Sequence, residues 1–266
     1  MSATMLVTGG SSGLGLEIAR VAAKDRRNLL LVARDPKRLE TAAAELRKNF
    51  DIVVEVFAQD LGVPSAADAV FAETQRRGLV VDALVNNAGF AYNGHFEEQD
   101  AGELANMLQT NVGTLTMLTR LFLPDMLARR DGRILNIAST AAFVPGPLMA
   151  VYYATKAYVL MFTEALVVEL AGTGVTATVA CPGVMMTGFQ ARAHLHHEAH
   201  MLRSPLVIDA KRVAAVSYRA MLAGRGVCVP GTLNAMAAFA SQLAPRSLSA
   251  RMAKGFQDAP HLRRRR

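Results

Sequence analysis

The stretch Leu6-Val7-Thr8-Gly9-Gly10-Ser11-Ser12-Gly13-Leu14-Gly15-Leu16-Glu17 decides the fold of this 266-residue chain. It joins a short apolar run to a segment of helical composition, which indicates a strand, a tight turn and the start of a helix. Glycine lets the backbone turn sharply and approach a ligand, and the free N–H groups at a helix N-terminus attract anions. A glycine-rich loop alone is a weak signal, because any tight turn uses glycine. In this strand–turn–helix context the loop predicts a site for the pyrophosphate of a nucleotide.

Strand-like and helix-like segments alternate along the rest of the chain. The predicted strands cover residues 4–7, 28–33, 52–58, 83–85, 133–138, 175–180 and 227–229. The predicted helices cover residues 17–24, 36–48, 65–77, 102–129, 152–171 and 209–223. Near-continuous apolar strands indicate a sheet that is buried on both faces and is therefore parallel. The repeated βα units predict an α/β fold, with a Rossmann-type doubly wound parallel sheet of about seven strands.

The organisation of the chain predicts a single domain. No linker or repeat divides residues 1–230, so we expect one domain over residues 1–231, followed by a C-terminal helical extension and basic tail over residues 232–266. Apolar residues make up 52% of the chain and charged residues 19%, which excludes a disordered chain. Trp is absent and aromatic residues reach only 6%, so the core must be aliphatic.

The positive charge of the chain lies at its C-terminal end. Residues 211–266 hold 11 Lys and Arg residues and one acid, so their net charge is +10, although the whole chain carries only +7. The final run Arg263–Arg266 lacks interleaved aromatic residues, so we interpret it as a solvated end and expect no nucleic-acid partner.

Within the C-terminal extension, Leu233, Met236, Ala237 and Ala240 recur at helical spacing. Two uses of this segment stay open. It is either a helix packed on the body or at a subunit interface, or an amphipathic segment in peripheral contact with a membrane, where nearby Arg side chains meet anionic head groups.

The two cysteines, Cys181 and Cys228, form neither a CxxC pair nor a metal-ligand spacing, so no disulfide framework is expected. The first strand begins at Thr4, which leaves no room for a signal peptide, and no uninterrupted apolar run is long enough for a membrane span. We therefore predict a cytoplasmic protein.

The spacing Thr8-Gly9-x-x-x-Gly13-x-Gly15 differs from the G-x-G-x-x-G form and resembles that of the short-chain dehydrogenase/reductase family, in its compact single-domain branch. The resemblance covers residues 4–190, with every motif in the family's order. It implies a bound nicotinamide dinucleotide. It assigns cofactor contacts to Gly9, Ser11, Ser12, Gly13, Leu14 and Gly15 of the loop, to Asp60, Leu61, Asn87, Ala88 and Gly89 after the next strands, and to Tyr152, Lys156, Pro182, Gly183 and Thr187.

The residues after the second strand favour NADP (NADPH) over NAD. An acid at position 33 would accept a hydrogen bond from a ribose 2′-hydroxyl and would repel a 2′-phosphate. The sequence instead has Ala33 followed by Arg34, whose guanidinium suits a phosphate. Asp35 leaves an alternative open, because its carboxylate can turn toward the ribose or neutralise Arg34.

Tyr152 and Lys156 are four residues apart and therefore share one face of a helix. A nearby ammonium stabilises phenolate and lowers the pKa of tyrosine. The adjacent Tyr153 lacks this partner. The family resemblance implies that Ser139, 13 residues before Tyr152, polarises a substrate carbonyl, and Thr140 is out of register for this role. It also implies that Asn111 bends its helix and holds a water in the proton relay.

The resemblance implies an oxidoreductase that interconverts a carbonyl and a secondary alcohol by hydride transfer, with Tyr152 as general acid/base. The walls of the substrate cleft are predicted at residues 90–92 and 143–149 and at Met185, Met186 and Phe189. They are mostly apolar and favour a small hydrophobic carbonyl or alcohol substrate.

The resemblance also implies a homo-oligomer, formed through the helices at residues 102–129 and 152–171. The alternative function is a catalytically silent NADP-binding regulatory or scaffold protein. The histidine-rich segment at residues 194–200 is interpreted as a substrate lid rather than a zinc site, so no metal is expected.

Overall fold

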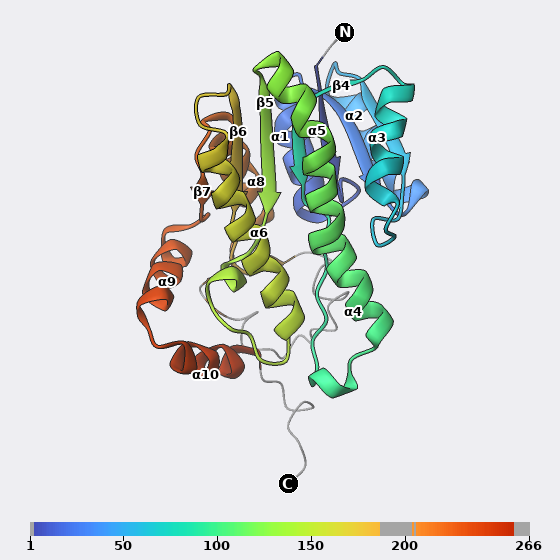
Figure 1. Ribbon diagram of the computed structural model, residues 1–266. Helices are drawn as coiled ribbons and strands as arrows, with labels where there is room; N and C mark the ends of the chain where they lie inside the picture. The colour runs from blue at the N-terminus through green and yellow to red at the C-terminus, as the bar shows by residue number, and fades with distance from the viewer. Residues whose placement is uncertain (1–2, 187–203, 205, 258–266) are drawn as a thin grey trace.

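The computed structural model describes residues 3–186, 204 and 206–257. Its seven strands form one sheet in the order β3-β2-β1-β4-β5-β6-β7, and every neighbouring pair is parallel (Figure 1). This arrangement confirms the predicted doubly wound α/β fold. The strands are β1 (Ala3–Thr8), β2 (Asn28–Ala33), β3 (Val54–Ala58), β4 (Val80–Asn86), β5 (Gly132–Ile137), β6 (Val175–Ala180) and β7 (Val227–Cys228).

Helices cover both faces of the sheet. One face carries α1 (Gly13–Lys24), α2 (Pro36–Asn49) and α8 (Ala210–Leu222). The other carries α3 (Ala66–Arg76), α5 (Leu115–Arg129) and α6 (Ala150–Glu169). At the carboxyl end of the sheet lie α4 (Ala101–Leu108), the short helices η1 (Phe96–Glu98) and η3 (Thr140–Phe143), α9 (Thr232–Leu243) and α10 (Arg246–Gln257) (Figure 1).

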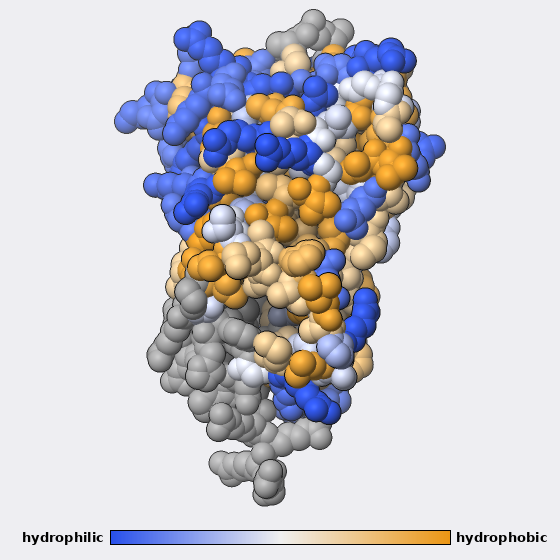
Figure 2. All heavy atoms as spheres, turned by 90° about the vertical axis from the view of Figure 1, so that its left-hand side faces the viewer, coloured by the Kyte–Doolittle hydropathy of each residue, from blue (hydrophilic) through white to orange (hydrophobic). Residues whose placement is uncertain are grey.

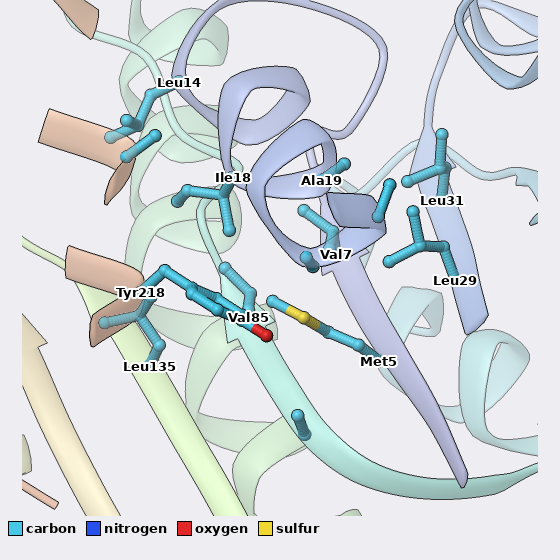
Figure 3. Packing of buried hydrophobic residues seen from close by; sticks show 14 of the residues in the cluster. Met5, Val7, Leu14, Ile18, Ala19, Leu29, Leu31, Val85, Leu135 and Tyr218 are labelled. Carbon is cyan, nitrogen blue, oxygen red and sulfur yellow. The ribbon is translucent and has the colours of Figure 1, made fainter. Parts of the chain in front are cut away.

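The core is aliphatic and lies in two layers, because successive side chains of a strand point to opposite faces. Met5 and Val7 pack with Ile18 of α1 and Tyr218 of α8 on one side of the sheet (Figure 3). Leu6 points to the other side, where it packs with the α5 layer. Strands buried on both faces explain why the apolar runs lack polar alternation.

The segment predicted as one helix over residues 102–129 is helical throughout, but it is not uniform. The structure divides this segment into α4, a π-helical stretch η2 (Gln109–Thr114), and α5. The π-helical stretch contains Asn111, which is 1% exposed. A π-bulge of this kind re-aims a side chain and is frequent at functional sites.

β4 is longer than the predicted strand at residues 83–85. It begins at Val80, and the polar residue Asp82 interrupts its apolar run. Asp82 forms an ion pair with Arg27 at 2.6 Å, and the pairing of β1 with β4 shifts register next to it. The ion pair lets the strand continue through a residue that the sequence pattern treats as a boundary.

The long helix α6 is apolar enough, by length and composition, to cross a bilayer. In the structure it packs against β6 and η3 as one of the layer helices of the α/β fold. Its N-terminal half carries Tyr152 and Lys156, which places both at the carboxyl end of the sheet.

Candidate active site

The glycine-rich loop leads from β1 into α1 at the carboxyl edge of the sheet. The Gly9 N–H donates to the carbonyl of Val32 at 2.7 Å, which ties the loop to the end of β2. Gly9 and Gly13 have φ values of +66° and +56°, which L side chains rarely adopt. Ser12 occupies the N-cap position of α1, and within the described chain its side chain makes no capping hydrogen bond. The N–H groups of the first turn therefore face the loop.

Because Gly15 has no side chain, α1 packs directly against the backbone of the glycine-rich loop. A β-carbon on Gly15 would lie 2.4 Å from the Gly9 carbonyl oxygen and 2.5 Å from Asn87 Nδ2. Leu14 beside it is buried in the core, while Ser11 is half-buried in the turn. Close backbone approach, free N–H groups and the positive end of a helix make this loop fit a dinucleotide pyrophosphate.

Arg34 and Asp35 have separate roles at the end of β2. The Asp35 carboxylate accepts hydrogen bonds from the N–H groups of Lys37 and Arg38 at 2.9 and 3.1 Å and caps α2. Both bonds end on Oδ1, so Asp35 has a structural role at the start of α2. Arg34 is exposed, and in the described part of the chain it forms no ion pair with Asp35.

The turn after β4 is fastened to β1 by Thr8. Thr8 Oγ1 accepts hydrogen bonds from the N–H groups of Asn87 and Ala88, both at 3.0 Å, and donates to the carbonyl of Val85 at 3.2 Å. Asn87 Nδ2 donates to the Thr8 carbonyl at 2.9 Å. These bonds hold Asn87, Ala88 and Gly89 at the sheet edge next to the glycine-rich loop.

A buried amide ladder below this turn is a feature that the sequence reasoning missed. Asn86 Nδ2 donates to Asn136 Oδ1 at 2.9 Å and to Thr119 Oγ1 at 3.1 Å. Asn136 Nδ2 donates to Thr163 Oγ1 at 2.9 Å. The ladder joins β4 and β5 to α5 and α6. Its signal in the sequence is an asparagine inside each of two otherwise apolar strands, where an unpaired amide would be costly.

Asp60 and Leu61 follow β3. Asp60 Oδ1 accepts a hydrogen bond from the Gly62 N–H at 2.9 Å and closes a turn. The carbonyl of the buried Leu61 accepts from Thr114 Oγ1 at 2.8 Å, which ties this turn to η2. Both residues lie near the end of their strand, at the predicted edge of the sheet.

Ser139 and Tyr152 meet beyond the carboxyl end of β5. The Tyr152 side chain is 9% exposed and is hydrogen-bonded to the Ser139 side chain. Burial raises the pKa of Tyr152 well above its usual value, and the hydrogen bond to Ser139 opposes this rise. Tyr153 instead packs against Gly146, where a β-carbon would lie 2.3 Å from its ring. The tyrosine that reaches Ser139 is therefore the one with lysine four residues on.

Lys156 lies below Tyr152 and is 5% exposed. Its Nζ donates to the Ile137 carbonyl at 2.8 Å and lies 5.8 Å from the centroid of the Tyr152 ring. Burial lowers the pKa of Lys156 to about 8. The lowering of the Tyr152 pKa that the spacing predicts is not seen, because burial outweighs the opposing hydrogen bond. The neighbouring Cys181 thiol stays uncharged, since burial raises its pKa to about 12.

Asn111 joins three elements of the site. Its Oδ1 accepts from the Phe90 N–H at 3.1 Å, and its Nδ2 donates to the Phe90 carbonyl at 2.9 Å and to Thr155 Oγ1 at 3.1 Å. A β-carbon on Gly89 would lie 2.9 Å from Asn111 Oδ1 and 3.5 Å from Lys156 Nζ. The amide oxygen and the ammonium therefore border the same small space above Gly89.

Only part of the predicted substrate walls packs with Tyr152, whereas Phe143 and Met185 pack against other clusters. Phe90, Ala91 and Met149 share one buried cluster with Tyr152. Leu148 has a φ of +67°, a conformation that its carbonyl helps to hold by accepting from the Gly94 N–H at 2.9 Å. A separate cavity of about 210 Å³ beside Leu79, Phe122 and Arg129 lies at the amino ends of the strands and contains none of the predicted site residues.

The turn after β6 brings Pro182 and Gly183 to Ser139. The Pro182 carbonyl accepts from the Thr140 N–H at 2.9 Å and from Ser139 Oγ at 3.4 Å. A β-carbon on Gly183 would lie 2.4 Å from Asn234 Oδ1 of α9. Thr187, Phe189 and the histidine-rich segment lie outside the described residues.

Comparison with known proteins identifies the family. A family described as short chain dehydrogenase matches residues 3–198. The chain belongs to the short-chain dehydrogenase family. This family consists of oxidoreductases. That activity is consistent with the glycine-rich loop, the Ser139–Tyr152 contact and the nearby Lys156.

The family's known members include relatives that resemble this chain over most of its length. "Ketoacyl reductase HetN" from Nostoc sp. is 38% identical over 187 residues, which cover 70% of this chain and 64% of that relative, so the match spans less than two thirds of the relative's length.

Two solved structures show the same fold. A short-chain dehydrogenase from Sphingobium yanoikuyae in complex with NADPH is 29% identical, with a TM-score of 0.80 over 91% of this chain and 94% of that chain. A short chain dehydrogenase/reductase from Burkholderia phymatum in complex with NAD is 25% identical, with a TM-score of 0.79 over 90% of this chain and 92% of that chain. Both nicotinamide cofactors thus occur among the family's similar structures.

Proposed function

We propose that this protein is an NADPH-dependent reductase that converts the ketone of an apolar 3-oxoacyl substrate into a secondary alcohol. The observation that carries the proposal is the hydrogen bond between Ser139 and Tyr152 beside a buried Lys156. The apolar cluster around Tyr152 and the ketoacyl reductase relative support the acyl character of the substrate.

The residues of the chain divide the chemistry among them. When bound, NADPH supplies the hydride that the carbonyl carbon accepts. The Ser139 hydroxyl donates a hydrogen bond to the carbonyl oxygen as negative charge develops there. Tyr152 gives its phenolic proton to that oxygen, which completes the alcohol. The ammonium of Lys156 stabilises the phenolate left behind, and it is mostly charged at neutral pH because its pKa of about 8 lies above 7.

Arg34 supports the preference for NADPH over NADH. It is an exposed cation at the end of β2, and the neighbouring Asp35 carboxylate is engaged in capping α2. A guanidinium accepts a 2′-phosphate, whereas NADH offers only a hydroxyl at this position.

The exposed apolar residues Met117 of α5 and Tyr158 and Met161 of α6 support a homo-oligomer formed through these helices. Each is at least 40% exposed in the single chain, and α5 and α6 lie side by side on one face of the sheet (Figure 1). Burial of such residues against a second copy would remove apolar area from water.

The test of the proposed function is a screen of carbonyl compounds with NADPH and with NADH. Turnover is measured as oxidation of the cofactor. The panel holds 3-oxoacyl thioesters of increasing chain length, bulky apolar ketones and small polar sugars. We expect turnover with NADPH that rises with the apolar length of the acyl chain. NADPH binding without turnover of any carbonyl would instead favour a catalytically silent regulatory protein.

A further inference from the structure

Helix α9 presents its large apolar side chains to solvent. Leu233, Met236, Phe239 and Leu243 are 55% to 74% exposed, whereas the buried position Ala238 carries only a methyl group. At 3.6 residues per turn, the four exposed side chains lie along one side of the helix, opposite Ala238. An ordinary surface helix has the reverse pattern, with its large apolar residues turned toward the core.

Polar contacts on its inner side fix the orientation of α9. Asn234 is 4% exposed, and its Nδ2 donates to the carbonyls of Leu206 at 3.2 Å and Pro230 at 3.4 Å. The same side chain packs against Gly183 in the turn beside Ser139. Turning the apolar side inward would break these contacts, so the outward direction of the apolar residues is built into the fold.

Helix α10 continues the pattern and adds positive charge. Leu248 and Met252 are 49% and 58% exposed and lie one turn apart. The exposed apolar residues of α9 and α10 together form what we call the C-terminal face, which consists of Leu233, Met236, Phe239, Leu243, Leu248 and Met252. Figure 2 views this side of the molecule and shows apolar residues gathered at the height of α9, below a hydrophilic upper part.

The two helices of the C-terminal face carry charge of one sign. Residues 232–257 hold three Lys and Arg residues and no Asp or Glu. All three basic residues, Arg246, Arg251 and Lys254, belong to α10. A large apolar patch with cationic neighbours matches the boundary between acyl chains and anionic head groups.

We propose that the C-terminal face docks on the surface of a membrane that contains anionic phospholipids. A second copy of the chain fits this face less well, because two-fold pairing places the same surface on both partners. The basic residues of α10 would then face their own copies, with no acid between residues 232 and 257 to pair with them. Anionic head groups supply the missing negative charge.

Docking through this face would bring the site end of the sheet to the lipid surface. α9 packs against η3, which begins directly after Ser139, and α9 and α10 lie at the carboxyl end of the sheet (Figure 1). An apolar substrate that partitions into the bilayer would then be concentrated next to the cleft.

The test is flotation of the full-length protein with phosphatidylcholine vesicles, with and without phosphatidylglycerol. We expect the protein to float only with the anionic vesicles, and raised salt should weaken the association. The double variant Phe239→Ser/Leu243→Ser should lose about tenfold or more in partitioning, because two inserted side chains are lost. The matched control is Val53→Ser/Val168→Ser, at positions that are 57% and 76% exposed and lie just before β3 and at the C-terminal end of α6; it should float like the wild type.

A second variant, Arg246→Gln/Arg251→Gln/Lys254→Gln, keeps the apolar side chains and should lose most of the preference for anionic vesicles. Thermal melts are expected to show all variants folded, since every substituted side chain in α9 is more than half exposed. No flotation of the wild type, or equal flotation of the α9 variant and its control, would overturn the proposal. A dimer in light scattering that only Phe239→Ser/Leu243→Ser dissociates would assign the face to a second copy instead.

Discussion

Replacing Asn111 with alanine should destabilise the protein because one buried side chain supplies three hydrogen bonds. These bonds reach the N–H and the carbonyl of Phe90 and the hydroxyl of Thr155. A neutral hydrogen bond contributes about 1 kcal/mol net, and a buried group left without a partner costs about 1–3 kcal/mol. Three lost bonds at a position that is 1% exposed should therefore lower the free energy of unfolding by about 3 kcal/mol.

Urea unfolding followed by circular dichroism measures this loss as a shift of the midpoint at an unchanged slope. Asn49→Ala is a suitable control, because Asn49 lies exposed at the end of α2 and makes a single hydrogen bond to the Glu45 carbonyl. That variant should lose less than about 1 kcal/mol. A loss this small for Asn111→Ala as well would refute the view that Asn111 fastens η2 to the loop after β4 and to α6.

Three further predictions concern the cofactor loop and the buried lysine. Gly15→Ala should weaken NADPH binding measured by fluorescence, because its β-carbon would lie 2.4 Å from a backbone oxygen, whereas Gly255→Ala, with open space around it, should not. Arg34→Ala should raise the Kd of NADPH about tenfold and leave that of NADH unchanged; equal effects on both would count against a phosphate contact. Burial lowers the pKa of Lys156 from 10.5 to about 8, so the folded chain binds fewer protons than the unfolded chain between these pH values and stability rises with pH there. Urea unfolding of Lys156→Met and of the wild type should be compared across this pH range. The free energy of unfolding of the variant minus that of the wild type should fall from pH 8 to 10.5, and a constant difference would contradict this pKa.

The sequence predicts the sheet well because its information is local. Apolar runs, glycines and breaks in composition mark each strand, and the βα alternation then determines a parallel sheet. The Tyr152–Lys156 pair was also predictable, since the spacing of four along a helix places both side chains on one face.

Other features depend on contacts between distant segments and could not be predicted. The family resemblance implied a bend in the helix at Asn111, but not the hydrogen bond from its amide to the backbone of Phe90, 21 residues earlier in the chain. The sequence does not show whether the Asp35 carboxylate caps α2, contacts a ribose or pairs with Arg34. The outward apolar side of α9 follows from the contacts of Asn234, which no hydrophobic pattern reveals.

The pKa of Tyr152 shows the same limit. Spacing alone predicts that Lys156 lowers it, but the structure gives the opposite direction because the phenol is buried. Burial depends on the whole fold, and its effect on the pKa of a tyrosine can be larger than that of one nearby residue.

The most direct test of the proposed reaction compares Tyr152→Phe with Tyr153→Phe, using NADPH and a 3-oxoacyl thioester. Turnover is measured by NADPH oxidation, and cofactor affinity by fluorescence. Removal of the proton donor should lower the turnover of Tyr152→Phe by about 10²–10⁴-fold while NADPH binding stays unchanged. Tyr153→Phe should retain most of the activity, because that ring packs against Gly146 rather than Ser139. Full turnover by Tyr152→Phe would contradict the assignment of the proton donor, and with it the proposed mechanism.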